Sequence, residues 1–230
     1  MKELLAEPRF RAARLWSNRV IAAIAPHLGG AVVNVSGWRD EDKAGRHYRD
    51  YFTSAAEYWI TNWKSEARGY QGDLENELFL DLEQPLPDEL RRRFDVVFNH
   101  TTLEHVFDIF TAFHNLCELS RDCVIVVVPF LQEEHGDYGD YWRFTPQALR
   151  RLFQREALDL AYLAANDQAV DAIYIVAVGA RSSATRERLR QLPGNAITSA
   201  TGSLGRHFWS GPRLWHGVRR LRDALRGWRK

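Results

Sequence analysis

Residues 129–144 bring together, in one short segment, side chains that could carry out polar chemistry. The segment reads Pro-Phe-Leu-Gln-Glu-Glu-His-Gly-Asp-Tyr-Gly-Asp-Tyr-Trp-Arg-Phe. His135 is a candidate general base, because the pKa of an imidazole lies near neutral. The alternative is an ordered loop whose aromatic residues pack on a sheet. Four further side chains are candidates for substrate binding: Asp137, Asp140, Tyr141 and Arg143.

Glu104 and His105 form a second pair of an acid and an imidazole, at the predicted start of a helix. As a functional pair they would face a site, with His105 a second candidate catalytic residue. As a structural pair, Glu104 would interact favourably with the positive end of the helix dipole. Asp137 and Asp140 have the spacing Asp-x-x-Asp, which could suggest a metal. Because no second ligand cluster accompanies them in the sequence, we predict no metal.

Seven short segments are predicted to form the strands that must position these side chains. Residues 122–128 form a continuous β-branched run, which is typical of a strand covered on both faces of a parallel sheet. Helices are predicted at 9–25, 103–119 and 145–156, the last with Thr145 as its N-cap and proline at its first position. The predicted strands are 31–35, 57–63, 78–82, 94–98, 122–128, 158–164 and 173–179.

The last two strands define the topology. Only residues 165–172 separate them, which is too short for a parallel crossover, so they should form an antiparallel hairpin at one edge. The predicted fold class is therefore α/β: a doubly wound, mostly parallel seven-stranded sheet with one antiparallel edge strand. Ligands of such sheets bind at the carboxyl ends of the strands. The most polar segments all follow predicted strand ends: 36–52, 62–64, 81–84, 99–105 and 129–144.

Three stretches together resemble class I S-adenosylmethionine-dependent methyltransferases, particularly the bacterial type 11 kind that is often found in glycan pathways. Residues 94–106, Phe-Asp-Val-Val-Phe-Asn-His-Thr-Thr-Leu-Glu-His-Val, are similar to the fourth strand of that family and the Leu-Glu-His that follows it. Residues 81–87, Asp-Leu-Glu-Gln-Pro-Leu-Pro, resemble the end of the third strand, which borders the adenine. Residues 129–146 resemble the loop after the fifth strand. The resemblance covers roughly residues 30–180 and implies a Rossmann-like methyltransferase fold.

The resemblance also implies S-adenosylmethionine as the cofactor. The loop that would hold it matches Val-Val-Asn-Val-Ser-Gly-Trp, residues 32–38, and departs from the family pattern. Ser36 and Trp38 stand where the family has glycines, which let the backbone turn tightly and approach the ligand. Asn62 replaces the acidic residue that accepts hydrogen bonds from the ribose. The implied cofactor-binding residues are Asn34, Ser36, Gly37, Asn62, Asp81, Leu82, Asn99, His100 and Thr101.

Charge is distributed unevenly along the chain. The formal net charge is +1, yet residues 205–230 carry eight Lys and Arg against one Asp, so the rest of the chain is mildly acidic. Leu214, Val218, Leu221, Leu225 and Trp228 would share one helix face within this basic segment, which fits an interfacial membrane helix. The alternatives are packing on the chain's own domain or on a second copy in a homodimer. No base-reading motif accompanies the charge, which argues against a nucleic-acid partner.

Domain organisation and location follow from the same patterns. We predict an N-terminal helix at 1–28, the α/β domain at 29–180, a linker at 181–204 and a basic amphipathic tail at 205–230. Cys117 and Cys123 fit buried small hydrophobes in a reducing cytosol. No apolar run approaches the roughly 20 residues of a membrane span. The expected location is cytoplasmic, with peripheral contact at the inner face of the membrane through the tail.

Two functions remain open from the sequence. The first is methyl transfer from S-adenosylmethionine to a glycan, or to another small or lipid-linked acceptor. The second is a non-catalytic binding or scaffold subunit with the same fold, which Trp38 favours because its ring could fill the space of the cofactor's methionine part. The two differ in whether the loop at 36–38 leaves room for the cofactor.

Overall fold

The computed structural model describes residues 3–64, 69–72, 74–136, 139–166 and 173–197, with the backbone only for residues 3–11. Over this part of the chain, seven strands form one sheet in the order β3-β2-β1-β4-β5-β7-β6. The strands are β1 (Gly30–Val35), β2 (Ala55–Asn62), β3 (Glu77–Phe79), β4 (Phe94–His100), β5 (Ser120–Leu131), β6 (Asp159–Ala165) and β7 (Ile173–Ala180).

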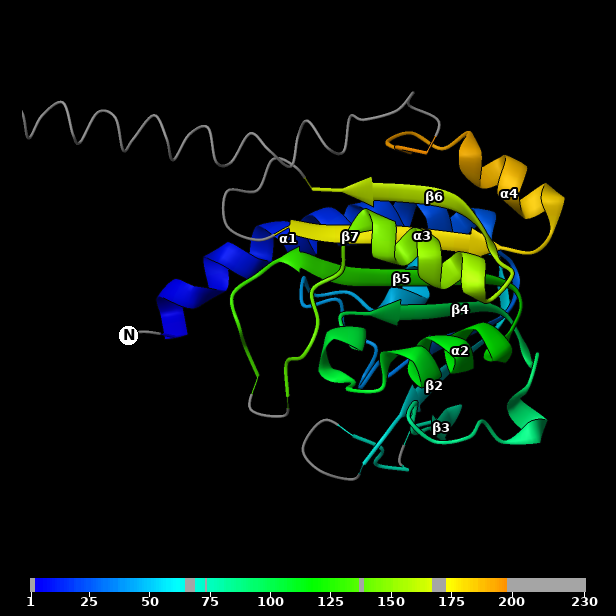
Figure 1. Ribbon diagram of the computed structural model, residues 1–230. Coiled ribbons are helices and arrows are strands. Elements are labelled where there is room, and N and C mark those ends of the chain that lie inside the picture. The colour runs from blue at the N-terminus through cyan, green and yellow to red at the C-terminus, as the bar shows by residue number, and fades with distance from the viewer. Residues whose placement is uncertain (1–2, 65–68, 73, 137–138, 167–172, 198–230) are drawn as a thin grey trace, which may run out of the picture.

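The strand directions confirm the predicted fold class. Strands β1 to β5 pair in parallel, whereas β7 runs antiparallel to both β5 and β6. The hairpin predicted from the short separation of the last two strands is therefore present, with β6 at the edge of the sheet and the reversed strand β7 beside β5 (Figure 1).

Helices cover both faces of the sheet and explain its two buried clusters. Helices α2 (Ile109–Leu119) and α3 (Pro146–Arg155) lie on one face, and α1 (Glu3–Ile24) lies on the other (Figure 1). Side chains of β4 and β5 alternate between the two clusters: Val97 and Val124 pack with α2, and Phe98 and Ile125 with α1. A strand enclosed in this way must be apolar on both sides, as the β-branched run in β5 predicted.

The predicted helix at 103–119 is wrong in its first turn. Residues Leu103–His105 form a short 3-10 turn, Val106 is extended, and α2 begins only at Ile109. Asp108 is the N-cap of α2, with its carboxylate accepting the N–H of Thr111 at 3.1 Å. Glu104 and His105 therefore precede the helix, and the interpretation of Glu104 as a partner of the helix dipole does not hold.

The predicted linker at 181–204 is also wrong in its first half. Helix α4 (Ser183–Arg190) occupies it, and Leu189 of this helix is fully buried against the α1 face of the sheet. Ser182 caps the helix, and Asp122 at the start of β5 accepts the N–H groups of Arg181 and Ser182. The predicted tail at 205–230 lies outside the described residues.

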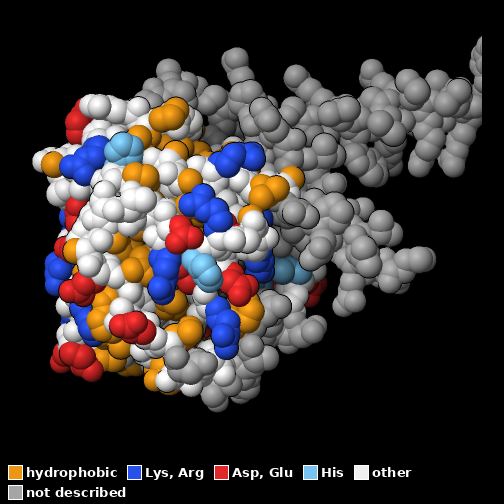
Figure 2. All heavy atoms as spheres, turned by 180° about the vertical axis from the view of Figure 1, so that it is seen from behind, with side chains coloured by type: hydrophobic (Ala, Val, Ile, Leu, Met, Phe, Trp, Pro, Cys, Tyr) orange, Lys and Arg blue, Asp and Glu red, His pale blue; other side chains and the backbone are white. Residues whose placement is uncertain are grey.

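The surface opposite α2 and α3 carries both signs of charge. Figure 2 shows Lys and Arg side chains interspersed with Asp and Glu over the described residues of this face. Among the helices that the structure describes, none combines the length and the apolar character needed to cross a bilayer.

Candidate functional site

The carboxyl ends of β1, β2 and β4 meet at the point where the strand order reverses. Val35, the last residue of β1, lies beside Thr61 of β2 on one side and Asn99 of β4 on the other. The chain leaves β1 toward β2 and β3 and later returns to add β4 and β5 on the opposite side. Ligands of open α/β sheets bind at such a switch point, so the candidate site begins here.

The turn after β1 packs tightly on the strand that it leaves. Ser36 and Trp38 have left-handed backbones, with φ of 56° and 50°. Gly37 donates its N–H to the Thr61 carbonyl at 3.2 Å, and a Cβ atom at Gly37 would lie 2.6 Å from Asn34 Nδ2. Only glycine fits at this position, because the turn lies directly against the Asn34 amide.

Asn34 and Asn62 use their amide groups within the protein. Asn62 Oδ1 accepts the Trp38 N–H at 2.7 Å, and its Nδ2 donates to the Trp38 carbonyl at 3.0 Å and to Glu77 Oε1 at 2.6 Å. Asn34 Nδ2 donates to Asp40 Oδ1 at 2.7 Å. Both side chains lie at the edge where the sequence placed them. Their described partners are the turn and its neighbours, which they hold in place.

No helix follows β1. In dinucleotide-binding folds the helix after the first strand directs its N-terminal N–H groups at the ligand. Residues 36–54 instead form turns and one 3-10 turn, η2 (Tyr48–Tyr51), stabilised by two buried carboxylates, Asp40 and Asp42. Asp40 accepts from Asn34, the Tyr58 hydroxyl and the Arg49 N–H, and Asp42 accepts from the Tyr51 hydroxyl and the N–H groups of Ala44 and Arg46.

Asp81 and Leu82 lie just past β3, because that strand ends at Phe79 rather than at the predicted Leu82. Asp81 is half-buried, and its Oδ1 accepts the N–H of Glu83 at 2.9 Å. Leu82 is buried in the core on the α2 side, where Asn115 Nδ2 donates to its carbonyl at 2.9 Å. Of these two residues, Asp81 therefore carries the polar group that could contact a ligand, and Leu82 holds the segment in place by packing in the core.

Asn99 is the least satisfied of the predicted cofactor residues. It is fully buried, and its Nδ2 donates to the Val35 carbonyl at 3.0 Å. Its Oδ1 has no hydrogen-bond partner among the residues that the structure describes. Buried polar atoms are rarely left unpaired, and those that are often mark a ligand position.

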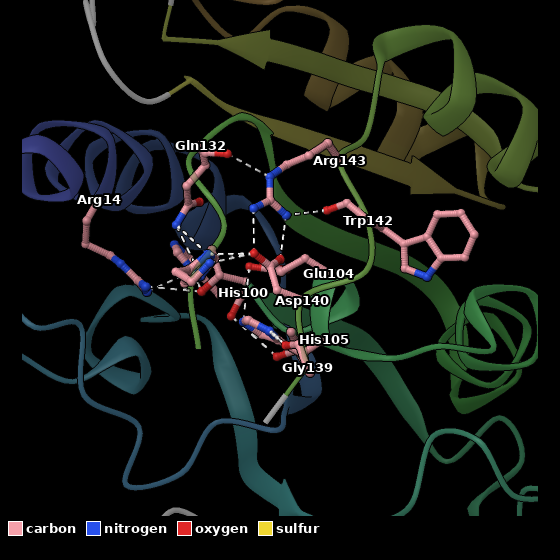
Figure 3. Close-up of polar contacts among 12 residues, drawn as sticks. Arg14, His100, Glu104, His105, Gln132, Gly139, Asp140, Trp142 and Arg143 are labelled. Atoms are coloured by element: carbon pink, nitrogen blue, oxygen red, sulfur yellow. Dashed lines mark hydrogen bonds and ion pairs between the residues drawn. The ribbon is translucent and has the colours of Figure 1, made fainter. Parts of the chain in front are cut away.

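His100 and Thr101 are engaged by α1, which the sequence did not indicate. Arg14 lies 2.9 Å from His100 Nδ1 and donates to Thr101 Oγ1 at 3.1 Å, and Ser17 Oγ lies 2.9 Å from His100 Nε2. Figure 3 shows Arg14 reaching His100 from the helix. Burial lowers the pKa of His100 well below its usual value, so the ring is neutral. Its side chain joins α1 to the sheet.

Glu104 is a buried acid beside the two predicted catalytic histidines. Its side chain has no exposed surface, and burial raises the pKa of its carboxyl group to about 8. His105 Nε2 lies 3.8 Å from Glu104 Oε1, and His105 Nδ1 contacts the carbonyl of Gly139. Burial lowers the pKa of His105. The turn at 103–105 thus faces the loop at 139–143 (Figure 3).

His135 and Asp140 come together in that loop with Arg143. Asp140 Oδ2 accepts the backbone N–H of His135 at 2.8 Å and lies 3.2 Å from His135 Nδ1. Arg143 donates to both carboxylate oxygens, and these hydrogen bonds lower the pKa of Asp140 to about 2. The predicted substrate residues Asp140 and Arg143 therefore form an ion pair that orients His135. Asp137 lies outside the described residues.

Tyr141 and Trp142 fix the loop from the outside. Their backbone N–H groups donate to the Glu104 carbonyl at 2.7 and 3.2 Å. The Tyr141 ring is half exposed and packs edge-on against Phe107, and the Trp142 indole points away from the ion pair (Figure 3). Both backbone contacts hold the loop over Glu104, and Tyr141 presents an aromatic surface beside it.

Glu104, His105 and His135 place one ligand-type atom each within 4.8 Å of one another. The sequence prediction of no metal considered the aspartates of the loop and treated Glu104 and His105 separately. The structure brings the two segments together because β4 and β5 are adjacent and each is followed by a loop at the same end of the sheet.

Comparisons with known proteins identify the fold. No protein-family model matches the chain, and no curated protein matches its sequence. Among solved structures, it is similar to 1,6-didemethyltoxoflavin-N1-methyltransferase of Burkholderia thailandensis, determined with 1,6-didemethyltoxoflavin and S-adenosylhomocysteine. The TM-score is 0.52 and the identity 14%, over 79% of this chain and 87% of the other.

A second similar structure is magnesium protoporphyrin IX methyltransferase of Synechocystis, determined with S-adenosylmethionine. The TM-score is 0.51 and the identity 10%, over 76% of this chain and 83% of the other. The chain therefore has the fold of class I S-adenosylmethionine-dependent methyltransferases, as its sequence resemblance implied.

Proposed function

We propose that this protein binds S-adenosylmethionine at the carboxyl ends of β1 to β4 and transfers its methyl group to a small-molecule acceptor. The observation that carries the proposal is Asn99 Oδ1, a fully buried acceptor without a hydrogen-bond partner among the described residues, beside the last residue of β1. It fits a ligand with a cationic amine donor, which the methionine part of the cofactor has. Asp81, which is half-buried, retains acceptor capacity for a ligand hydroxyl.

The cofactor, when bound, supplies an activated methyl group on its sulfonium. The chain's own contribution would be to bind and orient. Asn99 and Asp81 would fix the two ends of the ligand, and the backbone at Ser36 and Gly37 would line its middle. His135, with its Nδ1 side toward Asp140, would offer Nε2 to the acceptor for proton removal once the acceptor displaces the Gln132 amide, which lies 3.2 Å from Nε2.

The acceptor class follows from the sequence resemblance. We propose a hydroxyl group of a glycan or of a lipid-linked molecule, contacted from the loop at 139–143. Support comes from the Arg143–Asp140 ion pair and the half-exposed Tyr141 ring, since sugars commonly bind through charged side chains and an aromatic face. The tail at 205–230 is proposed to bind anionic membranes. Deleting it should abolish binding to anionic liposomes, and unchanged binding would contradict this role.

A second function is favoured by the turn after β1. Asn62 is hydrogen-bonded to Trp38 and Glu77, and residues 36–54, which connect β1 to β2, contain no α-helix. These features suit a non-catalytic subunit that keeps the fold but has given up the cofactor. The two functions make opposite predictions for cofactor affinity.

Calorimetric titration with S-adenosylhomocysteine separates them. Micromolar binding to the full chain supports the methyltransferase proposal, and Asn99→Leu should then weaken binding at least about tenfold, since one polar contact to a charged group contributes about 1.5–3 kcal/mol. Gln154→Leu, an exposed amide on α3, is the matched control and should bind as the wild type does. No binding at millimolar ligand to folded protein would instead support the scaffold function.

A further inference from the structure

The Glu104 carboxyl group is buried without a hydrogen bond from the described residues. The side chain has no exposed surface, and neither oxygen has a hydrogen-bond partner among the described residues. Its position is nevertheless well defined, because the Glu104 carbonyl accepts two N–H groups from the loop at 139–143. A buried acid costs several kcal/mol unless a cation or a hydrogen bond compensates it. A side chain held in this environment indicates a missing partner.

His105 presents a nitrogen lone pair to that acid. Its Nδ1 contacts the Gly139 carbonyl, which can only accept a hydrogen bond, so the ring proton lies on Nδ1. The lone pair is then on Nε2, which lies 3.8 Å from Glu104 Oε1. A cation between a carboxylate oxygen and an imidazole nitrogen would bind both. The Gly139 carbonyl behind the ring would also fix its orientation, as the outer partners of metal-bound histidines do.

His135 completes the set from the other loop. Its ring lies 5.1 Å from that of His105, centroid to centroid, at 71°. Asp140 lies 3.2 Å from His135 Nδ1, and Arg143 holds this carboxylate through both of its oxygens. A carboxylate on the Nδ1 side of the ring leaves Nε2 as the ligand atom, the arrangement found in carboxylate–histidine–zinc triads. Gln132 Nε2 lies 3.2 Å from His135 Nε2, so this amide has to turn away when the metal binds.

We propose that Glu104, His105 and His135 form a binding site for one divalent transition-metal ion of the zinc class. Their ligand-type atoms lie within 4.8 Å of one another, and two ligands of a tetrahedral zinc ion are about 3.4 Å apart at bond lengths near 2.1 Å. Side-chain shifts of about 1 Å therefore close the site. Two imidazoles and one carboxylate favour zinc or iron(II) over magnesium or calcium, which prefer oxygen ligands alone.

Three protein ligands leave a fourth coordination position for an oxygen atom of a ligand. The half-exposed Tyr141 ring flanks the loop on its outer side. Metal binding does not depend on cofactor binding, because none of the three ligands belongs to the set predicted to hold the cofactor. It can therefore be tested separately. It does use His135 Nε2, so a bound metal would replace the role of this atom in proton removal.

The test is calorimetric titration of the metal-free, full-length protein with zinc chloride, with Co²⁺ absorption spectra to report the coordination. We expect one equivalent bound at micromolar affinity or tighter, with visible Co²⁺ bands typical of four-coordination. Glu104→Gln and His135→Ala should each weaken zinc binding at least about tenfold, as even the loss of outer partners has effects of that size. Near-UV circular dichroism checks that each variant is folded.

His114→Ala is the matched control, because the exposed His114 forms a histidine–carboxylate pair with the largely buried Glu156, 2.7 Å away, on another part of the molecule. It should bind zinc as the wild type does. Loss of binding in this variant with retention in His135→Ala would overturn the proposal, as would no zinc binding to the wild type. Titration with S-adenosylhomocysteine in parallel keeps a failure of this site distinct from a failure of the cofactor site.

Discussion

Two polar clusters at the same end of the sheet differ in how many of their buried polar groups are hydrogen-bonded. The first lies at β1 and β2, where Asp40 and Asn62 meet donors and acceptors on all sides. The second lies after β4 and β5, where Glu104 has no hydrogen-bond partner among the described residues. Both carboxylates, Asp40 and Glu104, are almost fully buried, so burial alone does not account for the difference.

The difference separates structural from functional burial. A satisfied network rigidifies a loop, and the segment after β1 needs this because it has no helix to order it. An unsatisfied buried acid is costly to the fold and is retained where it binds something. We infer that the first cluster stabilises the turn at 36–38, beside the proposed cofactor site. The second cluster, around Glu104, is inferred to bind a ligand.

Removing Asp40 should have the largest effect. In Asp40→Ala, Asn34 and the Tyr58 hydroxyl lose their buried acceptor, and the backbone at Arg49 loses its anchor. We expect the free energy of unfolding to fall by about 3–5 kcal/mol. Urea denaturation measures it, with the exposed Asp88→Ala as control. A loss no larger than that of the control would show that the network is not structural.

Replacing Asn62 should have the next largest effect. Asn62→Leu leaves the Trp38 N–H and carbonyl without their described partner, and we expect a loss of about 1–3 kcal/mol in the free energy of unfolding. The 36–38 turn should also exchange its amide hydrogens faster. Unchanged exchange there would mean that Asn62 does not hold the turn.

Replacing Glu104 should increase the free energy of unfolding rather than decrease it. Glu104→Met fills the same volume without a polar group, and no described hydrogen bond is lost. We expect the metal-free variant to be more stable than the wild type by about 1–2 kcal/mol, because apolar replacement of an uncompensated buried polar group is often stabilising. Destabilisation in the same urea experiment would show that Glu104 already has a partner in the folded protein.

The smallest expected effect concerns Asp122, a satisfied carboxylate remote from both clusters. Burial would raise its pKa, but hydrogen bonds from Thr185, Ser182 and Arg181 outweigh this and lower it. A lowered pKa in the folded state stabilises the protein above about pH 4, the ordinary range of an aspartate, and the contribution disappears as the pH falls below it. Thermal unfolding between pH 6 and pH 3 should therefore be less pH-dependent in Asp122→Asn. Equal slopes would contradict the coupling of α4 to β5.

The pattern of apolar residues and the lengths of the segments between them predicted most of the fold, but not the elements with a polar sequence. The continuous apolar run of β5 and the eight residues between the last two strands sufficed for the sheet and its hairpin. Helix α4 was not predicted, because its sequence is polar and only Thr185 and Leu189 of it are buried. Its N-cap at Ser182 was the available signal. The sequence did not reveal that α2 begins at Ile109 rather than at Leu103, because its N-cap, Asp108, lies within an apolar stretch.

The sequence predicted which end of the sheet holds the candidate site, but not which of its side chains lie next to one another. Strand ends placed Asn99, Glu104 and His135 at one end of the sheet. The meeting of Glu104 with His135 depends on the loop at 139–143 returning to the Glu104 carbonyl, a contact between backbone atoms that no side-chain pattern encodes. The engagement of His100 by Arg14 depends likewise on the angle at which α1 crosses the sheet.

The most direct test of the account is hydrogen exchange of the full chain with and without S-adenosylhomocysteine. Because the cofactor is proposed to bind at the carboxyl ends of β1 to β4, we expect slower exchange at residues 36–38, 81–82 and 99–101 and no change in α4. Binding measured by calorimetry without protection of these three segments, or protection confined to other parts of the chain, would contradict the account.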